Sequence, residues 1–201
     1  MTLPQPKQAR SEETLRRILA ACDTLIAKRP FEQISMQDIA REAKVSVGNL
    51  YNRFKDKDGL VNHVIAGHQE RFRALLIESL ASLPADLDTR ARLDALVGIS
   101  KEAIRNLGPL FLTAAARLAQ GQPPQAAVSG NSQDLVDEMC DWLLAGDTTL
   151  SPERCRFAVA SILFGLQYDL LFGTATRLFG DDYSGELAEQ AHCYLVCKHD
   201  E

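Results

Sequence analysis

The chain has 201 residues, 46% hydrophobic and 24% charged, which is ordinary for a soluble globular protein of one or two domains. Its first 60 residues hold 11 Lys and Arg against 8 Asp and Glu, a net +3, whereas the remainder holds 11 against 19, a net −8. The polar start MTLPQPKQAR is unlike a signal peptide, and no uninterrupted apolar run approaches a membrane span, so we expect a cytoplasmic protein with no membrane partner.

Apolar residues follow helical spacing along most of the chain, and no pattern in the sequence indicates a β-sheet, so we predict an all-α fold. The arm to about Arg10 is expected to be mobile. A helix is predicted from Glu12 to about Lys28, and Pro30 ends it. Its buried stripe is Leu15, Ile18, Leu19, Cys22, Leu25 and Ile26.

Residues 35–59, SMQDIAREAKVSVGNLYNRFKDKDG, predict two short helices separated by a four-residue turn. Ser35 can cap the first helix, and Asp38 fits the capping box as a weaker partner than Glu. Ser46 can cap the second helix. Apolar positions at i, i+3 and i+7 give the second helix an inward face, formed by Val47, Leu50 and Phe54.

The opposite face of the second helix carries Gly48, Asn49 and Asn52. A glycine inside a helix costs about 1 kcal/mol relative to alanine, and close approach of the backbone to something bulky would explain it. With the positive charge of this region, the pattern predicts a helix-turn-helix whose second helix enters the major groove of DNA. The residues that flank this face are Tyr51, Arg53, Lys55 and Lys57.

The rest of the chain continues the helical pattern. The segment from about Pro152 to Phe179 is apolar on almost every side, so we expect it to be buried on every side, partly by a second subunit. Residues 1–60 are predicted to form the DNA-binding domain and residues 61–201 a ligand-binding and dimerisation domain, bridged by a helix that begins near residue 57. The other predicted helices are 57–80, 89–106, 110–119, 132–145 and 186–198, with a loop at 121–130.

A homodimer is expected from the second domain. Helices at about 152–178 and 186–198 would pack as a four-helix bundle with those of a second copy. The small or apolar residues expected in that interface are Ala158, Ser161, Gly165 and Leu187.

Residues 14–65 resemble the DNA-binding domain of TetR-family transcriptional regulators. The element LYxxFxxKxxL carries the resemblance most specifically, together with ISMQDIAREAKVSVGNLYNRF before it. Two positions depart from the family, because Lys44 and Pro30 stand where the family commonly has glycine. A non-glycine residue in a left-handed turn stores roughly 1 kcal/mol of strain. The element itself consists here of Leu50, Tyr51, Phe54, Lys57 and Leu60.

The resemblance implies roles for individual residues on double-stranded DNA. Tyr51 would donate to a backbone phosphate, although a core aromatic is the alternative, and Lys57 would bind a phosphate at the start of the fourth helix. Asn49 and Asn52 could pair with adenine edges, and Val47 could meet a thymine methyl. The full predicted DNA-binding set is Ser46, Val47, Gly48, Asn49, Tyr51, Asn52, Arg53 and Lys57.

The resemblance also implies a repressor that a mostly apolar small-molecule effector releases from a palindromic operator. Asp169 is an acid within an apolar helix and could pair with Arg117, with Arg177 or with a cationic ligand. The aromatic candidates for a ligand cavity are equally explained as core residues. The predicted pocket residues are Phe111, Arg117, Trp142, Phe164, Tyr168 and Asp169.

The sequence gives less support to other classes of function. The sequence has no nucleophile elbow, phosphate loop or HExxH motif, so we predict neither an enzyme nor a cofactor. The five scattered cysteines predict reduced thiols, and a metal at His192, Cys193, Cys197 and His199 is less expected than simple packing. The alternative to DNA binding is a helical interaction or scaffold protein.

Overall fold

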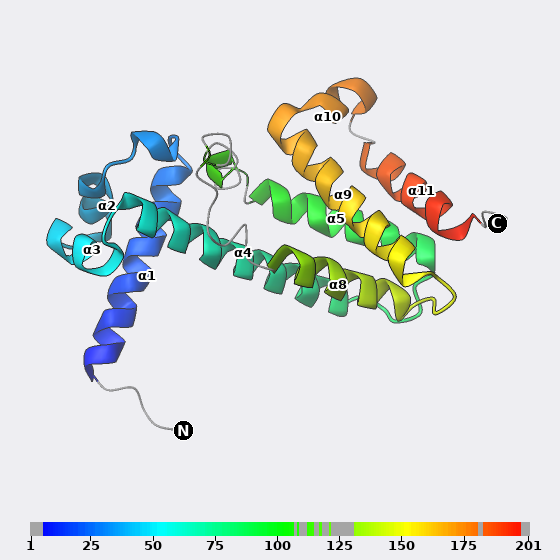
Figure 1. Ribbon diagram of the computed structural model, residues 1–201, viewed down its shortest axis with the longest axis horizontal. Helices are drawn as coiled ribbons and strands as arrows, with labels where there is room; N and C mark the ends of the chain where they lie inside the picture. Colours follow the sequence, from blue (N-terminus) through cyan, green and yellow to red (C-terminus); the bar gives the residue numbers. More distant parts are fainter. Residues whose placement is uncertain are drawn as a thin grey trace. The chain divides into compact units, whose positions relative to one another are not determined.

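The computed structural model describes residues 6–106, 108, 112–114, 117, 121, 131–180 and 183–197, without the side chains of 6–8, 131, 132, 174 and 179. All secondary structure in this described part is helical, which confirms the predicted all-α fold (Figure 1). Contacts divide the chain into two compact units. The first comprises residues 1–68 and 109–126, and the second comprises residues 69–108 and 127–201.

The first unit packs the long helix α1 and several shorter elements around one apolar core. It contains α1 (Pro6–Ile26), the 3-10 turn η1 (Phe31–Gln33), α2 (Met36–Ala43), α3 (Val47–Phe54) and the start of α4 (Lys57–Ala81). α1 begins at Pro6, ahead of the predicted Glu12, and proline suits the first turn of a helix because its missing N–H has no partner there anyway. The fully buried side chains of this core include Ile18, Ile34, Ile39, Leu50 and Leu60.

The second unit consists of helices that pack around α9 (Pro152–Phe172). Its other helices are the remainder of α4, α5 (Thr89–Asn106), α8 (Asn131–Leu144), α10 (Thr174–Phe179) and α11 (Tyr183–Val196). α9 contacts α5, α8 and α11, so it is the central helix of the unit. The fully buried side chains here include Leu76, Leu93, Leu96, Met139, Leu143 and Ile162.

The predicted single helix from Pro152 to Phe179 is wrong, because it breaks at Gly173. Gly173 adopts a left-handed conformation (φ 58°, ψ 21°), and its N–H bonds the carbonyl of Asp169 at 2.7 Å. The carboxylate of Asp169 then accepts from the N–H and the hydroxyl of Thr176, at 2.9 and 2.5 Å. Apolar residues continue at helical spacing into α10, so the sequence pattern did not reveal that the helix ends at a glycine cap.

The length and composition of α9 bear on the expectation that no segment spans a membrane. By length and mean hydropathy it is apolar enough to cross a membrane, since isolated polar residues interrupt its apolar run without lowering the average much. Six of its side chains nevertheless lie in the core of the second unit, which is how a central helix of a helical bundle passes the same test. The six are Cys155, Ala158, Val159, Ile162, Leu163 and Leu166.

Sequence analysis did not identify Arg92, a buried cation that joins α5 to α8. Its guanidinium donates to the carbonyl of Trp142 at 2.6 Å, to that of Ala85 at 2.8 Å and to that of Leu87 at 3.1 Å. It also lies 4.7 Å from the centre of the Trp142 ring. Gly146 lies so close that a Cβ there would be 2.0 Å from the Arg92 Nε. Arg92 therefore binds the connection before α5 to the end of α8.

Candidate nucleic-acid interface

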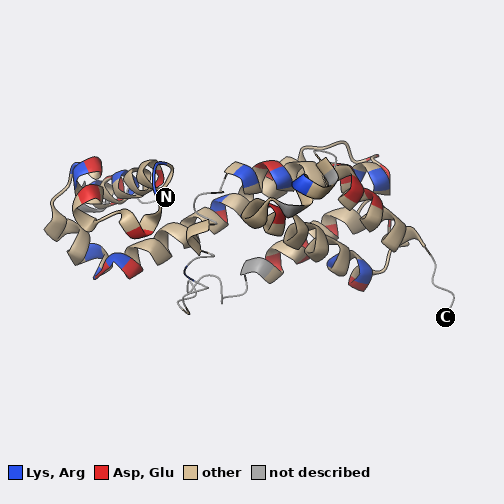
Figure 2. Ribbon diagram, turned by 90° about the horizontal axis from the view of Figure 1, so that it is seen from above, with Lys and Arg blue, Asp and Glu red and all other residues tan. Residues whose placement is uncertain are grey.

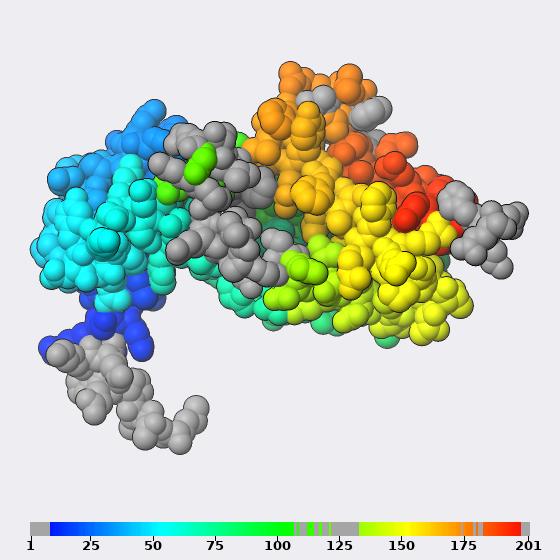
Figure 3. Space-filling model, in the orientation of Figure 1, coloured from blue at the N-terminus to red at the C-terminus, as the bar shows by residue number. Residues whose placement is uncertain are grey.

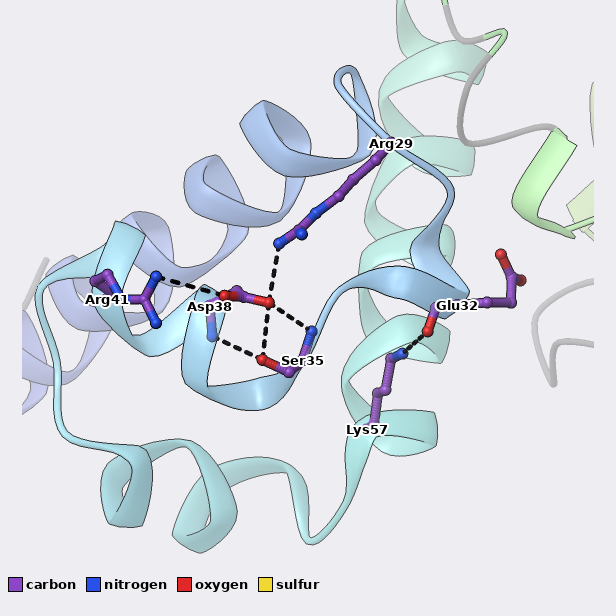
Figure 4. Close-up of polar contacts among 6 residues, drawn as sticks. All are labelled: Arg29, Glu32, Ser35, Asp38, Arg41 and Lys57. Carbon is purple, nitrogen blue, oxygen red and sulfur yellow. Dashed lines mark hydrogen bonds and ion pairs between the residues drawn. The ribbon is translucent and has the colours of Figure 1, made fainter.

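The first helix of the predicted motif is fixed by a complete capping box (Figure 4). The Ser35 hydroxyl accepts from the Asp38 N–H at 3.1 Å, and the Asp38 carboxylate accepts from the Ser35 N–H at 3.1 Å. Arg29 pairs with the same carboxylate at 2.9 Å and Arg41 does so at 3.6 Å. The hydrogen bonds from Ser35, and then the two guanidinium groups, lower the pKa of Asp38. The start of α2 is therefore held from two sides.

The turn between α2 and α3 has the left-handed geometry expected for it. Lys44 adopts φ 55° and ψ 46°, and its N–H reaches the carbonyls of Ala40 and Arg41. Val45 then bonds the Ala40 carbonyl at 3.0 Å and packs against the core of the first unit. The Ser46 hydroxyl accepts from the Asn49 N–H at 3.2 Å, which confirms the predicted cap of α3. Lys44 thus bears the strain at a position where glycine would avoid it.

A second tight turn, between α3 and α4, was not predicted. Lys55 adopts φ 60° and ψ −52°, and the Asp56 N–H bonds the Phe54 carbonyl at 2.5 Å. The Asp56 carboxylate accepts from the Gly59 N–H at 2.7 Å. A Cβ at Gly59 would lie 2.4 Å from the Phe54 carbonyl oxygen, so only glycine fits there. This turn sets Lys57, at the first position of α4, directly after α3.

The outward face of α3 is open. Leu50 and Phe54 are buried and Val47 is half-buried against the core, as their spacing predicted. Ser46, Gly48, Asn49, Tyr51 and Asn52 are exposed, and no heavy atom lies within 4 Å of the position that a Gly48 Cβ would take. Internal packing therefore does not require glycine at position 48. An exposed polar helix face with a bare backbone is suited to the major groove.

Arg53 is not free in the structure, because it bonds α1. Its Nη2 donates to the Ser11 carbonyl at 3.0 Å and to the Ser11 hydroxyl at 2.6 Å. Ser11, Asn49, Asn52 and Arg53 line a shallow recess beside α3. Ser11 escaped the sequence analysis because the first helix was expected to begin after it. Pro6 was the signal that could have placed that start correctly.

Lys57 is also engaged within the first unit (Figure 4). Its ammonium donates to the Glu32 carbonyl at 3.2 Å and lies 4.6 Å from the centre of the Phe31 ring. Partial burial lowers the pKa of Lys57, an effect that nearby Glu32 and Asp58 oppose. An ammonium has three N–H donors, so this one bond leaves donors for a phosphate oxygen. Lys57 is thereby oriented at the N-terminus of α4.

Of the predicted ligand-pocket residues that the structure describes, Arg117 belongs to the first unit and the other four belong to the second. Phe111 lies outside the described residues, as do most of the predicted helix 110–119 and of the loop 121–130. Arg117 belongs to the first unit, where it binds Asp58. Trp142 packs under Arg92. Each of these two described side chains has a structural partner in the chain.

The remaining three pocket candidates lie on α9. Phe164 and Tyr168 are 72% and 55% exposed, and the ring centres of Tyr168 and Phe172 lie 4.6 Å apart. The Asp169 carboxylate accepts from the N–H and the hydroxyl of Thr176, whereas Arg117 pairs with Asp58 and Arg177 donates to the Gly173 and Phe172 carbonyls. Two of the three therefore point outward.

The expected dimer residues need a correction. Ala158 and Leu187 are buried, and a Cβ at Gly165 would meet Tyr183 at 2.8 Å and Leu187 at 3.4 Å within the same chain. Ala158, Gly165 and Leu187 therefore lie between α9 and α11 inside one subunit, whereas Ser161 is exposed. The small size of Ala158 and Gly165 permits the close approach that the sequence analysis assigned to a second copy.

No three His, Cys, Asp or Glu side chains converge as metal ligands among the residues that the structure describes. Cys193 and Cys197 are exposed near the end of α11, and Cys22, Cys140 and Cys155 are buried. Burial raises the pKa of Cys22 and of Cys140 to about 12. His199 lies outside the described residues.

Comparison with known proteins places the helix-turn-helix in a family. The family model described as "Bacterial regulatory proteins, tetR family" matches residues 18–64. The transcriptional repressor KstR2 of Rhodococcus jostii is 35% identical over 103 residues, which is 50% of this chain and 49% of that protein. The repressor KstR of the same organism is 28% identical over 83% of this chain and 74% of its own length. The chain thus spans about half the length of KstR2.

Solved structures extend the likeness to the whole fold. A TetR-family transcriptional regulator from Rhodococcus sp. aligns with a TM-score of 0.66 and 20% identity over 92% of this chain and 100% of that one. Another from Mesorhizobium loti aligns with a TM-score of 0.65 and 15% identity over 95% and 97% of the two chains. At these identities the likeness is one of fold.

Proposed function

Because the chain belongs to the TetR family of bacterial regulatory proteins, we propose that it is a DNA-binding transcriptional regulator and that it acts as a repressor. The observation that carries the proposal is the open face of α3 beside a correctly capped turn. Its named relatives KstR2 and KstR are repressors, which supports repression over activation. We assign no catalytic role to the chain, and we propose that it works in the cytoplasm.

On DNA, α3 would lie in the major groove. Asn49 and Asn52 would read base edges, while Tyr51 and Lys57 would hold backbone phosphates. Ser46, Val47 and Gly48 would bring the start of α3 close to the bases. Arg53 would act mainly by holding α3 against α1 through Ser11. We propose residues 1–60 as the DNA-binding domain.

We propose that the chain binds a palindromic operator as a homodimer, because the exposed face of a single α3 is small. One short helix contacts few base pairs, and two copies would reach successive major grooves about 34–36 Å apart. An exposed aromatic stripe on α9 supplies a surface for the second copy, and part of α9 is open in the space-filling view (Figure 3). Its residues recur at i, i+7, i+11 and i+15: Phe157, Phe164, Tyr168 and Phe172.

We further propose that a small, mostly apolar effector binds in residues 61–201 and releases the DNA. A ligand can do this only if it binds the released state more tightly than the DNA-bound state, typically by about 1–3 kcal/mol. The support is the size of the second unit, which exceeds what an interface along α9 needs.

A gel-shift selection tests the DNA-binding proposal. The chain is mixed with labelled genomic fragments, bound fragments are sequenced, and sedimentation measures the mass of the free protein. A recovered two-fold symmetric sequence and a dimeric mass would support the proposal. Absence of any bound fragment at low salt, with a folded protein, would contradict it and favour the helical interaction protein instead.

A further inference from the structure

The start of α4 carries more negative charge than a phosphate site should. Asp56 and Asp58 flank Lys57 in sequence, so these three residues together have a charge of −1. Acidic residues are common at helix N-termini because they satisfy the free N–H groups, and Asp56 does so at Gly59. A DNA phosphate would compete for the same end of the helix and would be repelled by both carboxylates.

Arg117, which lies 59 residues after Asp58 in sequence, offsets this negative charge. Its Nη1 donates to the Asp58 carboxylate at 2.9 Å, within the first unit. The Arg117 side chain is only 11% exposed, whereas that of Asp58 is 63% exposed. Arg117 is therefore largely enclosed by the first unit, and the ion pair holds the more exposed Asp58 carboxylate against it. The four charges at the start of α4 then sum to zero.

Two described residues close to Arg117 in sequence also contact the first unit. Thr113 is buried, and Ala114 packs against the same apolar core that holds Leu50 and Leu60. Arg117 Nε is buried and makes no hydrogen bond, so the contact with Asp58 is made through Nη1.

We propose that Arg117 is a positioning residue for the DNA phosphate at the start of α4, because it neutralises Asp58 and holds that carboxylate aside. The inference rests on the proposed DNA-binding function. It moves Arg117 from the predicted effector pocket to the DNA-binding unit. It also makes phosphate binding by Lys57 depend on a residue outside the helix-turn-helix.

The test replaces Arg117 by Met, which keeps an unbranched apolar stem and removes the charge. The probe is a fluorescent duplex of random sequence, about 30 base pairs long so that both heads of a dimer can bind. Arg117→Met should weaken binding about tenfold at about 50 mM salt and by less at about 200 mM, because salt screens the exposed carboxylate. Arg117→Lys should bind nearly as well as the unaltered chain.

The double variant Asp58→Asn with Arg117→Met separates the effect of the Asp58 charge from the effect of packing at position 117. It has the same methionine and the same packing as the single variant, yet it should recover affinity to within about twofold. Glu102→Gln with Arg117→Met is the matched control, since it makes the same change of net charge on α5 and should recover nothing.

Three results would overturn the inference. Arg117→Met could bind as tightly as the unaltered chain at every salt concentration. The Asp58→Asn double variant could stay as weak as Arg117→Met, in which case Arg117 acts through packing. The Glu102→Gln control could recover affinity equally, in which case only net charge matters. Absence of DNA binding by the unaltered chain is a distinct outcome, which overturns the proposed function and this inference together.

Discussion

Replacing Gly48 by Ala separates the stability of α3 from its access to DNA. Gly48 is the second residue of α3, and its added Cβ would meet no heavy atom within 4 Å. The substitution therefore removes the conformational freedom of glycine without creating a clash. We expect the free energy of unfolding to rise by about 0.5–1 kcal/mol. For a chain of this length the midpoint of thermal unfolding should rise by about 1–4 °C.

The same methyl group should weaken DNA binding. If the α3 backbone lies against the floor of the major groove at Gly48, a methyl group there would hold the helix about 1 Å further from the bases. The donor–acceptor distances at Asn49 and Asn52 would then be too long for a good hydrogen bond. Each lost base contact is worth about 1–3 kcal/mol, so affinity for a selected operator should fall at least about fivefold. Fluorescence anisotropy with that operator measures the loss, and calorimetry measures the stability.

Gly98→Ala provides the control. Gly98 is an exposed glycine in α5, and its added Cβ also meets nothing within 4 Å. It should stabilise the protein by a similar amount and leave DNA binding unchanged. If Gly48→Ala bound the operator as tightly as the unaltered chain, the close approach of α3 to DNA would be refuted. A stabilised protein with reduced affinity is the combination that only the proposed docking predicts.

Further substitutions test the interface, the fold and the dimer. Lys57→Ala should weaken binding to all sequences alike and reduce the slope of log affinity against log salt by about one, whereas Asn49→Ala should change the preferred sequence in a binding selection. Gly146→Ala should destabilise the second unit by about 1–3 kcal/mol in urea unfolding, because its Cβ would overlap the anchored Arg92 side chain, and an unchanged midpoint would contradict this. Phe164→Glu should give a folded monomer by sedimentation and circular dichroism, because this residue is 72% exposed and lies on the proposed dimer surface; a persistent dimer would place the interface elsewhere.

The features that short stretches of sequence determine were predictable. The two caps of the helix-turn-helix depend on Ser35, Asp38 and Ser46, each within three residues of its partner, and all three form as predicted. The inward positions of α3 follow from helical spacing alone, and Leu50 and Phe54 are buried accordingly. Local geometry and binary patterning fix these elements before any long-range packing acts.

The features that need distant partners were not predictable. Nothing in the spacing of residues pairs Arg53 with Ser11 or Arg117 with Asp58, which are separated by 42 and 59 positions. The end of α9 at Gly173 was missed for a different reason. Apolar residues continue the helical period beyond it, so the pattern alone gave no reason to stop, and only the left-handed backbone shows the break.

The cations of the first unit fall into two groups whose partners differ, and the difference bears on DNA binding. Arg29 and Arg41 bind the carboxylate of Asp38, so part of their charge is cancelled where it stabilises α2 (Figure 4). Lys57 binds a carbonyl and Arg53 binds a carbonyl and a hydroxyl, and neutral oxygens orient a cation without cancelling its charge. Both signs of charge occur along the helices of each unit (Figure 2), so net charge alone would not locate the DNA-binding face. Lys57 and Arg53 therefore keep their charge while neutral oxygens orient them, and at the start of α4 a phosphate would meet the full charge of Lys57 only because Arg117 offsets Asp58.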